Sequence, residues 1–137
     1  MAFTLINSEQ RLSAPIEYRI GTNAEAFTIG EIAKLSSGVL TSADVNSAGS
    51  QHYVVLADVT GATGVANVPV TRLRKDLTFR VMSTGQVAAT TIGNYYTLHT
   101  DRKSITATTT NGIFEITKTD GAATSTVEGR FMNAKSL

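Results

Sequence analysis

Glycine interrupts this chain at short intervals, and the interval limits what can form between the breaks. From Gly21 to Gly129 the breaks often fall eight to twelve residues apart, a spacing typical of the short strands of a β-sandwich or β-barrel. Threonine accounts for 21 of the 137 residues, and its β-branched side chain fits a pleated strand better than a helix. The sequence therefore predicts an all-β fold, either a small β-barrel or a β-sandwich.

Alternation of apolar and polar residues marks the clearest strands. They are predicted at 53–59, 77–82, 94–99, 113–117 and 125–132. Asn111-Gly112 favours a tight type I′ hairpin between 105–110 and 113–118, because both central residues of that turn need positive φ. Asp120-Gly121 begins a second reversal, so the last third of the chain is predicted to be a three-stranded meander.

A short segment occurs twice. Thr28-Ile29-Gly30, followed by Leu35, returns 63 residues later as Thr91-Ile92-Gly93, followed by Leu98. In each copy we expect a glycine turn at the start of a strand. A common structural origin and chance similarity both remain open for so short a match.

Residues 1–20 differ from the rest because they contain no glycine, include Pro15 and carry several charges. We interpret them as an extended N-terminal arm that lies on a neighbouring protein, ahead of a single β domain at 21–137. The alternative is an ordinary first strand folded on its own domain.

Composition argues against several functions. The chain has no cysteine, which excludes disulfides, thiolate zinc sites and thiol catalysis. Its net charge of +1 gives no electrostatic basis for direct nucleic-acid binding. No apolar segment approaches the length of a membrane span or forms a signal peptide. We therefore expect no membrane partner and assembly inside a cytoplasm.

No catalytic motif is recognisable. His52 and His99, with Asp101, offer a metal site only as a weak alternative to two strand-end residues. The segment 58–61 does not match the aspartic-protease motif, and 61–64 lacks the Lys-Ser/Thr of a phosphate-binding loop. The substrate-binding and phosphate-loop motifs of deoxyuridine triphosphatases are also absent. We expect a protein that is not an enzyme and needs no cofactor or metal.

The densest basic group is Arg72, Arg74 and Lys75, next to Asp76. On a strand Arg72 and Arg74 would share a face and form a positive stripe for acidic side chains of a protein partner. The alternative is a solvated strand edge.

The order of strands and turns resembles that of the small head decoration, or cement, proteins of tailed bacteriophages. The resemblance covers roughly residues 20–132 and rests on the polar N-terminal segment and four later segments. These are 27–35 leading to 38–40, 53–58 after a Ser/Gly/Ala linker, 92–98, and the closing pair 112–116 and 129–131.

The resemblance implies a structural protein without catalytic residues. Such proteins bind the outer surface of an expanded capsid, often as trimers, and clamp adjoining subunits of the major capsid protein. It therefore implies a virion location and a homo-oligomer, with a trimer favoured over a monomer. The expected partner contacts are Phe3, Leu5, Arg11, Leu12 and Arg19 in the arm, and Arg72, Arg74 and Lys75 in the basic group.

Two other functions remain as alternatives. One is a different small virion component, such as a tail-tube, head-completion or fibre-base protein. The other is a glycan-binding module in which Tyr53, Tyr95, Tyr96 and Phe114 stack on sugar rings, although adjacent Tyr95 and Tyr96 must point to opposite faces of a strand.

Overall fold

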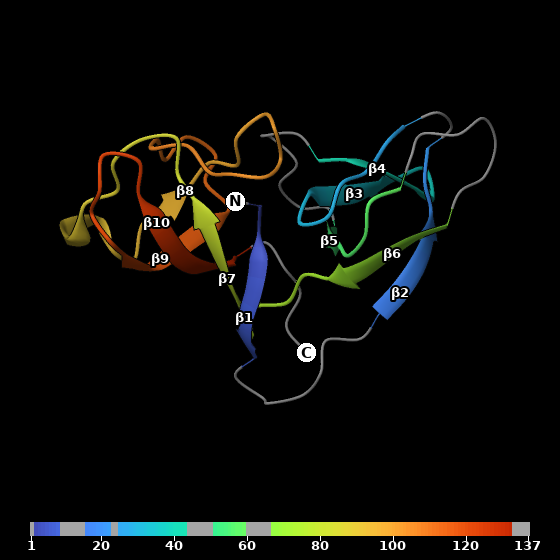
Figure 1. Cartoon of the computed structure of the whole chain (residues 1–137), viewed down its shortest axis with the longest axis horizontal. Helices are drawn as coiled ribbons and strands as arrows, with labels where there is room; N and C mark the ends of the chain where they lie inside the picture. Colours follow the sequence, from blue (N-terminus) through green and yellow to red (C-terminus); the bar gives the residue numbers. More distant parts are fainter. Residues whose placement is uncertain (1, 9–15, 23–24, 44–50, 60–66, 133–137) are drawn as a thin grey trace.

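The protein is built from two antiparallel five-stranded sheets, seen side by side in the computed structural model (Figure 1). The structure describes residues 2–8, 16–22, 25–43, 51–59 and 67–132. Sheet I has the strand order β2-β6-β5-β3-β4, and sheet II the order β1-β7-β10-β9-β8. The strands of sheet I are β2 (Ile16–Ile20), β3 (Ile32–Ser36), β4 (Val39–Ser42), β5 (His52–Val55) and β6 (Asn67–Arg72). Those of sheet II are β1 (Thr4–Ser8), β7 (Leu77–Met82), β8 (Tyr95–Tyr96), β9 (Phe114–Thr119) and β10 (Thr126–Phe131), with a 3-10 turn, η1 (Ala89–Thr91), before β8.

The all-β prediction is confirmed. The sheets pack against each other as in a β-sandwich, and neither closes into a barrel. The larger core cluster lies within sheet II and at its contact with sheet I, and it contains Ile32 and Val54 of sheet I together with sheet II residues such as Phe79 and Phe114. A smaller cluster around Phe27 lies within sheet I.

The two sheets repeat one arrangement. From the β2 edge to the β4 edge, the strands of sheet I are the first, fifth, fourth, second and third strands of that sheet in chain order. Sheet II, without β1, reads β7-β10-β9-β8, and the segment after β8 then bonds to residues 104–108, for example through the bridge between Leu98 and Ile105. Residues 104–108 therefore lie in sheet II where β4 lies in sheet I. Each half of the chain therefore forms one five-stranded unit of the same topology.

Individual backbone contacts recur between the units. Parallel bridges join Gly21 to Leu40 and Ser83 to Ile105. The same correspondence holds for N–H to carbonyl hydrogen bonds: Thr22 to Leu40 (2.8 Å) and Thr84 to Ile105 (2.9 Å), Gly30 to Val55 and Gly93 to Ile116 (both 2.8 Å), and Leu73 to His52 (3.0 Å) and Met132 to Ile113 (2.8 Å).

The repeated Thr-Ile-Gly segment is the turn that opens the second strand of each unit. Gly30 and Gly93 have φ of 79° and 97°, and the residue after each donates its N–H to the threonine carbonyl at 3.1 Å. A turn with positive φ at its third residue requires glycine there. The sequence similarity therefore corresponds to one shared turn in two equivalent places.

The N-terminal segment does not form a separate arm in the described residues. Residues 4–8 are β1, which pairs with β7, and residues 16–20 are β2, which pairs with β6. Phe3 is 4% exposed and packs edge-on against Phe79 and Phe114. An aromatic side chain at this position stabilises the fold by burial, so β1 and β2 follow the first-strand alternative, and contact of residues 1–20 with a neighbouring protein stays a prediction.

Strand bounds follow the sequence in part. The strand predicted at 77–82 is confirmed as β7. Of the strand predicted at 53–59, only residues 53–55, which belong to β5, form a strand, and of the strand predicted at 94–99 only β8 does. The tight hairpin at Asn111-Gly112 is also wrong: Asn111 has φ of 52°, but Gly112 has no positive φ and 105–110 is not a strand. Gly112 is needed for close packing instead, because a Cβ there would lie 2.2 Å from the Tyr95 carbonyl oxygen. The reversal at Asp120-Gly121 does connect β9 to β10.

Candidate interaction surface

One face of sheet I is covered by sheet II over only part of its width. Directly opposed residues run across this face from Ile32 on β3 to Val54, Thr71 and then Ile16 on β2. Ile32 and Val54 are buried against sheet II, but Ile16 is 61% exposed. The face that makes the core contact thus extends, uncovered among the described residues, onto β2.

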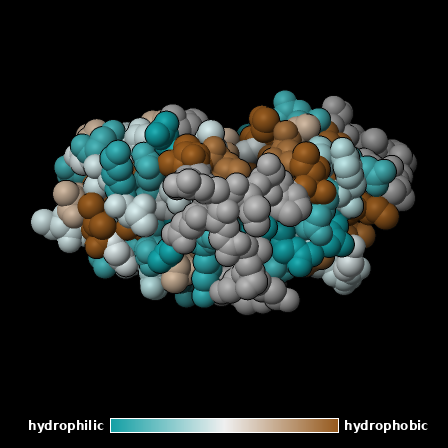
Figure 2. Space-filling view, turned by 90° about the horizontal axis from the view of Figure 1, so that it is seen from below, coloured by the Kyte–Doolittle hydropathy of each residue, from teal (hydrophilic) through white to brown (hydrophobic). Residues whose placement is uncertain are grey.

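The uncovered part is apolar. Ile16, Tyr18 and Ile20 alternate along β2 and are 61%, 70% and 45% exposed; we call them the β2 stripe. Figure 2 shows hydrophobic residues gathered on the surface of the right-hand half of the molecule. Large apolar side chains scattered singly on a surface need no explanation, but a row of three on one strand is a candidate interaction site.

The opposite face of β2 carries charges. Arg19 Nη2 and Arg72 Nη2 each lie 3.2 Å from Glu17 Oε1, and both guanidinium groups lie over the buried Tyr53 ring, at 5.5 and 5.8 Å from its centroid. The hydrogen bond to Glu17 raises the pKa of Arg72 above its usual value. This cluster, which we call the Glu17 cluster, fixes the orientation of β2 by placing the charges over the ring and the apolar side chains outside.

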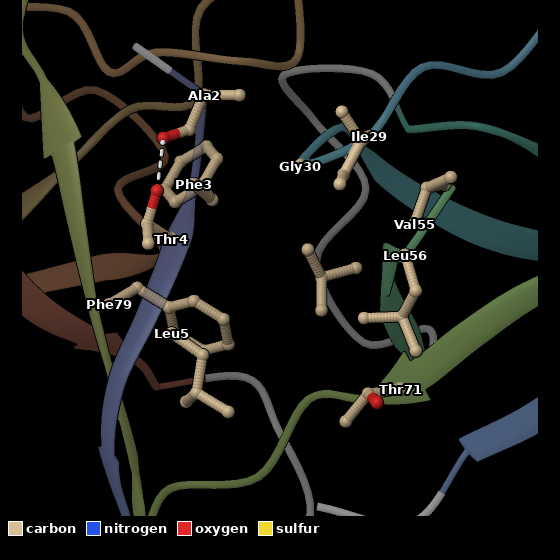
Figure 3. Close-up of a pocket in the computed structure, with 11 residues that line it drawn as sticks. Ala2, Phe3, Thr4, Leu5, Ile29, Gly30, Val55, Leu56, Thr71 and Phe79 are labelled. Carbon is tan, nitrogen blue, oxygen red and sulfur yellow. Dashed lines mark hydrogen bonds between the residues drawn. The ribbon is translucent and has the colours of Figure 1, made fainter. Parts of the chain in front are cut away.

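A groove lies between the two sheets next to the same face (Figure 3). Its volume is about 300 Å³, and its lining is largely apolar. Leu5 on β1, 42% exposed, projects into it from one side, and Leu56 and Thr71 line the other side. Ile29, 59% exposed, lies at its rim in the Thr-Ile-Gly turn. Because Thr71 lines the groove and is opposite Ile16, the groove lies next to the first residue of the β2 stripe.

The structure brings some of the predicted contact residues together. Phe3 and Leu5 line the groove, and Arg19 and Arg72 share the Glu17 cluster. Arg11 and Leu12 lie outside the described residues.

The predicted positive stripe is wrong. β6 ends at Arg72, and Arg74 is 8% exposed with its Nε 3.2 Å from Asp76 Oδ1. Lys75, which lies between Arg74 and Asp76 in the sequence, is half-buried. A buried arginine requires a paired carboxylate, and Asp76 supplies it two residues later, so Arg74 cannot present its charge to a partner beside Arg72.

Sequence reasoning missed the β2 stripe. Its signal was present as Ile-x-Tyr-x-Ile, but alternation alone does not say which face of a strand meets solvent.

Several polar side chains of the described residues hold local structure together. Glu31, 2% exposed, accepts hydrogen bonds from Thr28, Ser42 and Arg102. His99 Nδ1 lies 3.3 Å from Asp101, while His52 is buried in β5. Among the described residues no three His, Cys, Asp or Glu side chains are grouped so that they could hold a metal ion.

Burial raises the pKa of Asp101, but hydrogen bonds from the Lys103 N–H, Ser104 and His99 outweigh it and hold the pKa below its usual value. By accepting hydrogen bonds from the Lys103 N–H and the Ser104 hydroxyl, Asp101 stabilises the loop that follows β8.

Comparison with known proteins gives no identification. No protein-family model matches the chain, and no curated protein matches it. No helix in the described part of the chain is long and apolar enough to cross a membrane.

Proposed function

We propose that this chain is a structural virion protein that binds the outer surface of an expanded phage capsid and cements adjoining capsid subunits. The groove between β1 and the β5–β6 side of sheet I carries the proposal, because it offers an open, apolar site to a protein segment. The similarity of the strand and turn order to that of head decoration proteins supports the choice of a capsid as the partner.

The groove fits an extended segment of a capsid subunit. One wall is an edge strand, β1, which pairs only with β7 among the described strands. A partner strand added to such an edge gains main-chain hydrogen bonds, and its side chains fill the apolar space beside it. Many copies on a lattice convert modest individual affinities into firm attachment. No catalytic step is part of this function.

Aromatic burial argues against the glycan-binding alternative. Tyr53 and Phe114 are fully buried, Tyr96 is 4% exposed, and only Tyr95 of the four, at 44%, has a ring available to a sugar. Stacking against one tyrosine gives little affinity compared with an apolar groove.

The two Thr-Ile-Gly turns provide a matched test. Ile29→Asp places a charge at the groove, and Ile92→Asp places the same charge at the equivalent turn of the other unit, where the isoleucine is 48% exposed. Purified variants are added to expanded capsids that lack the protein, and bound copies are counted against the major capsid protein by quantitative mass spectrometry.

We expect Ile29→Asp to weaken binding by about tenfold or more and Ile92→Asp to bind like the wild type. Equal binding of both variants would exclude the groove as the contact. A handful of wild-type copies per virion would place the protein at the tail or a vertex.

A further inference from the structure

The outer edge of β2 is closed at one end and open at the other. Gly21, the residue after β2, forms a parallel bridge with Leu40 of β4, and the Thr22 N–H donates to the Leu40 carbonyl at 2.8 Å. Ile16–Tyr18, at the other end, pair with β6 on one side and have no strand on the other side within the described part of the chain. We call Ile16–Tyr18 the open edge.

The open edge offers main-chain hydrogen-bonding groups. Pro69 lies opposite Tyr18 on β6, and its carbonyl accepts the N–H of Leu56, the residue after β5, at 2.9 Å. The Pro69 carbonyl therefore points away from β2. Because opposed residues of an antiparallel pair either bond to each other or both point away, the N–H and carbonyl of Tyr18 point outward from the sheet.

The other unit shows how a strand is added at this place. β7 is equivalent to β2, and its outer edge is closed in the same way by the bridge between Ser83 and Ile105. β1 nevertheless pairs with β7 in antiparallel orientation, along Leu77–Arg80. Since the Ser83 bridge is equivalent to the Gly21 bridge, this pairing ends before the closed part of the edge. A strand can therefore add along the open edge of β2 without reaching the bridge to β4.

The residue before β1 is an anchor in the other unit. The ring centroid of Phe3 lies 5.6 Å from that of Phe114 and 5.2 Å from that of Phe131. The equivalents of these two residues are Tyr53 and Arg72, which belong to the Glu17 cluster. The corresponding residue of a strand added to β2 would therefore lie against the Glu17 cluster.

The position of that anchor along β2 follows from the register. On β1, Thr4 opposes Arg80, which is equivalent to Tyr18. Phe3 comes one residue earlier in the antiparallel strand. Its counterpart in a strand added to β2 therefore lies opposite Arg19.

The Glu17 cluster favours an acidic side chain at this anchor. The guanidinium groups of Arg19 and Arg72 share one carboxylate, that of Glu17, so the cluster has an excess of positive charge. Both arginine side chains are partly exposed, and Arg19 Nε has no hydrogen-bond partner among the described residues. A carboxylate from a partner would form charge-assisted hydrogen bonds with these groups.

We propose that the open edge binds an extended segment of a different protein as an antiparallel strand whose side chains follow the order acidic, apolar, basic. The acidic residue lies opposite Arg19, the apolar residue opposite Tyr18 and the basic residue opposite Glu17. Main-chain hydrogen bonds supply affinity in such a complex, and the side chains supply specificity. Opposite charges in opposed positions stabilise the pairing, and like charges destabilise it.

The occupant is not β2 of a second copy of this chain. Glu17-Tyr18-Arg19 has the required order, but that strand is itself closed at its end by the bridge at Gly21. The open edge is also separate from the groove beside β1, so the proposal does not depend on capsid binding.

Two peptides of identical composition test the proposal. The first, acetyl-Ala-Glu-Val-Lys-Val-Ala-amide, has the expected order, and the second, acetyl-Ala-Lys-Val-Glu-Val-Ala-amide, has its charges exchanged. Each is titrated into the isotope-labelled full chain, and the backbone amide shifts are followed by NMR. We expect the first peptide to bind about tenfold more tightly than the second, with the largest shifts at Ile16 and Tyr18.

A charge-exchanged protein is the matched control. Glu17→Arg combined with Arg19→Glu keeps the composition of the chain and should reverse the preference between the two peptides. Thermal melts establish that the variant is folded. If it does not fold, Tyr18→Pro replaces it, because proline removes only the outward N–H and is tolerated on an edge strand. Tyr18→Pro should bind neither peptide, whereas Tyr18→Val should keep the preference for the first.

A preference for the first peptide, with shifts at Ile16 and Tyr18 and with the expected response of the variants, would establish the site. Equal binding of the two peptides, or no saturable shift with either at millimolar concentration, would overturn it. So would an unchanged preference in the folded charge-exchanged protein. Shifts confined to Leu5 and Leu56 would assign the peptide to the groove instead and also overturn the proposal.

Discussion

The two five-stranded units place the same backbone around different interiors. Where sheet II has Phe79, Val81 and Phe131 facing its core, the equivalent positions of sheet I hold Glu17, Arg19 and Arg72. Other interior positions keep their character: Tyr53 and Phe114, Val55 and Ile116, and Val68 and Val127 are equivalent pairs.

Because of these different residues, the charged face of β2 points inward and its apolar face points outward. On β7 the apolar residues face inward and Thr78 and Arg80 face outward, whereas on β2 the charges lie over Tyr53 and the apolar residues face outward. Sheet II completes its interior with Phe3, the residue before β1, whose ring centroid lies 5.2 Å from that of Phe131. The interior of one unit is thus completed by Phe3 of the same chain, and the other unit leaves an apolar strand face exposed among the described residues.

The largest expected difference between the units is at the pair Phe131 and Arg72. Phe131 is 2% exposed, with ring centroids 5.0 Å from Phe114 and 5.7 Å from Phe79. Phe131→Ala should lower the free energy of unfolding by about 3–5 kcal/mol, because it leaves a cavity in the core. Arg72→Ala should cost about 1 kcal/mol, the value of an exposed ion pair and cation–π contact. Urea unfolding compares them, and similar losses would show that the two interiors are energetically alike.

A smaller difference is expected at the two repeated turns. Alanine at Gly30 or Gly93 should cost about 1–2 kcal/mol, because both residues have positive φ. At Gly30 the new Cβ would also lie 2.5 Å from Ala2 Cβ and 3.0 Å from the Phe3 carbonyl oxygen, whereas at Gly93 nothing lies within 4 Å. Gly30→Ala should therefore be the more destabilising in urea unfolding. Equal losses would mean that β1 moves away from the turn at no cost.

The smallest expected effect concerns one carboxylate in each unit. Burial raises the pKa of Glu25, but hydrogen bonds from Ser42 and Thr41 outweigh it and leave the pKa lowered, as at Asp101. A lowered folded-state pKa adds stability that is complete above the ordinary values of 4.5 and 3.8 and is lost as pH falls through the folded values.

Glu25→Gln and Asp101→Asn should therefore lower the melting temperature slightly near neutral pH. The difference from the wild type should shrink as the solution is acidified below the ordinary pKa values. A difference that stays constant down to acid pH would show that the lost hydrogen bonds, and not the charge, account for the effect.

The sequence by itself determined the fold class and the positions of several turns. Threonine content and glycine spacing predicted an all-β chain, the alternation at 77–82 predicted β7, and Asp120-Gly121 predicted the β9–β10 reversal. The Thr-Ile-Gly repeat indicated two equivalent turns. These signals are local, because a positive φ or a two-residue period depends on a few neighbouring residues.

Only the tertiary structure decided which face of each strand is inside. The pattern of β2 separates Ile16, Tyr18 and Ile20 from Glu17 and Arg19, but the usual rule would bury the apolar set. That rule fails here because Tyr53 and Arg72, distant in sequence, hold the charged set over the interior of sheet I. Likewise, Arg74 is buried in an ion pair with Asp76, although the sequence predicted that it lies beside Arg72 on one surface. A strand has two faces, and its orientation is set by which distant residues pack against each of them.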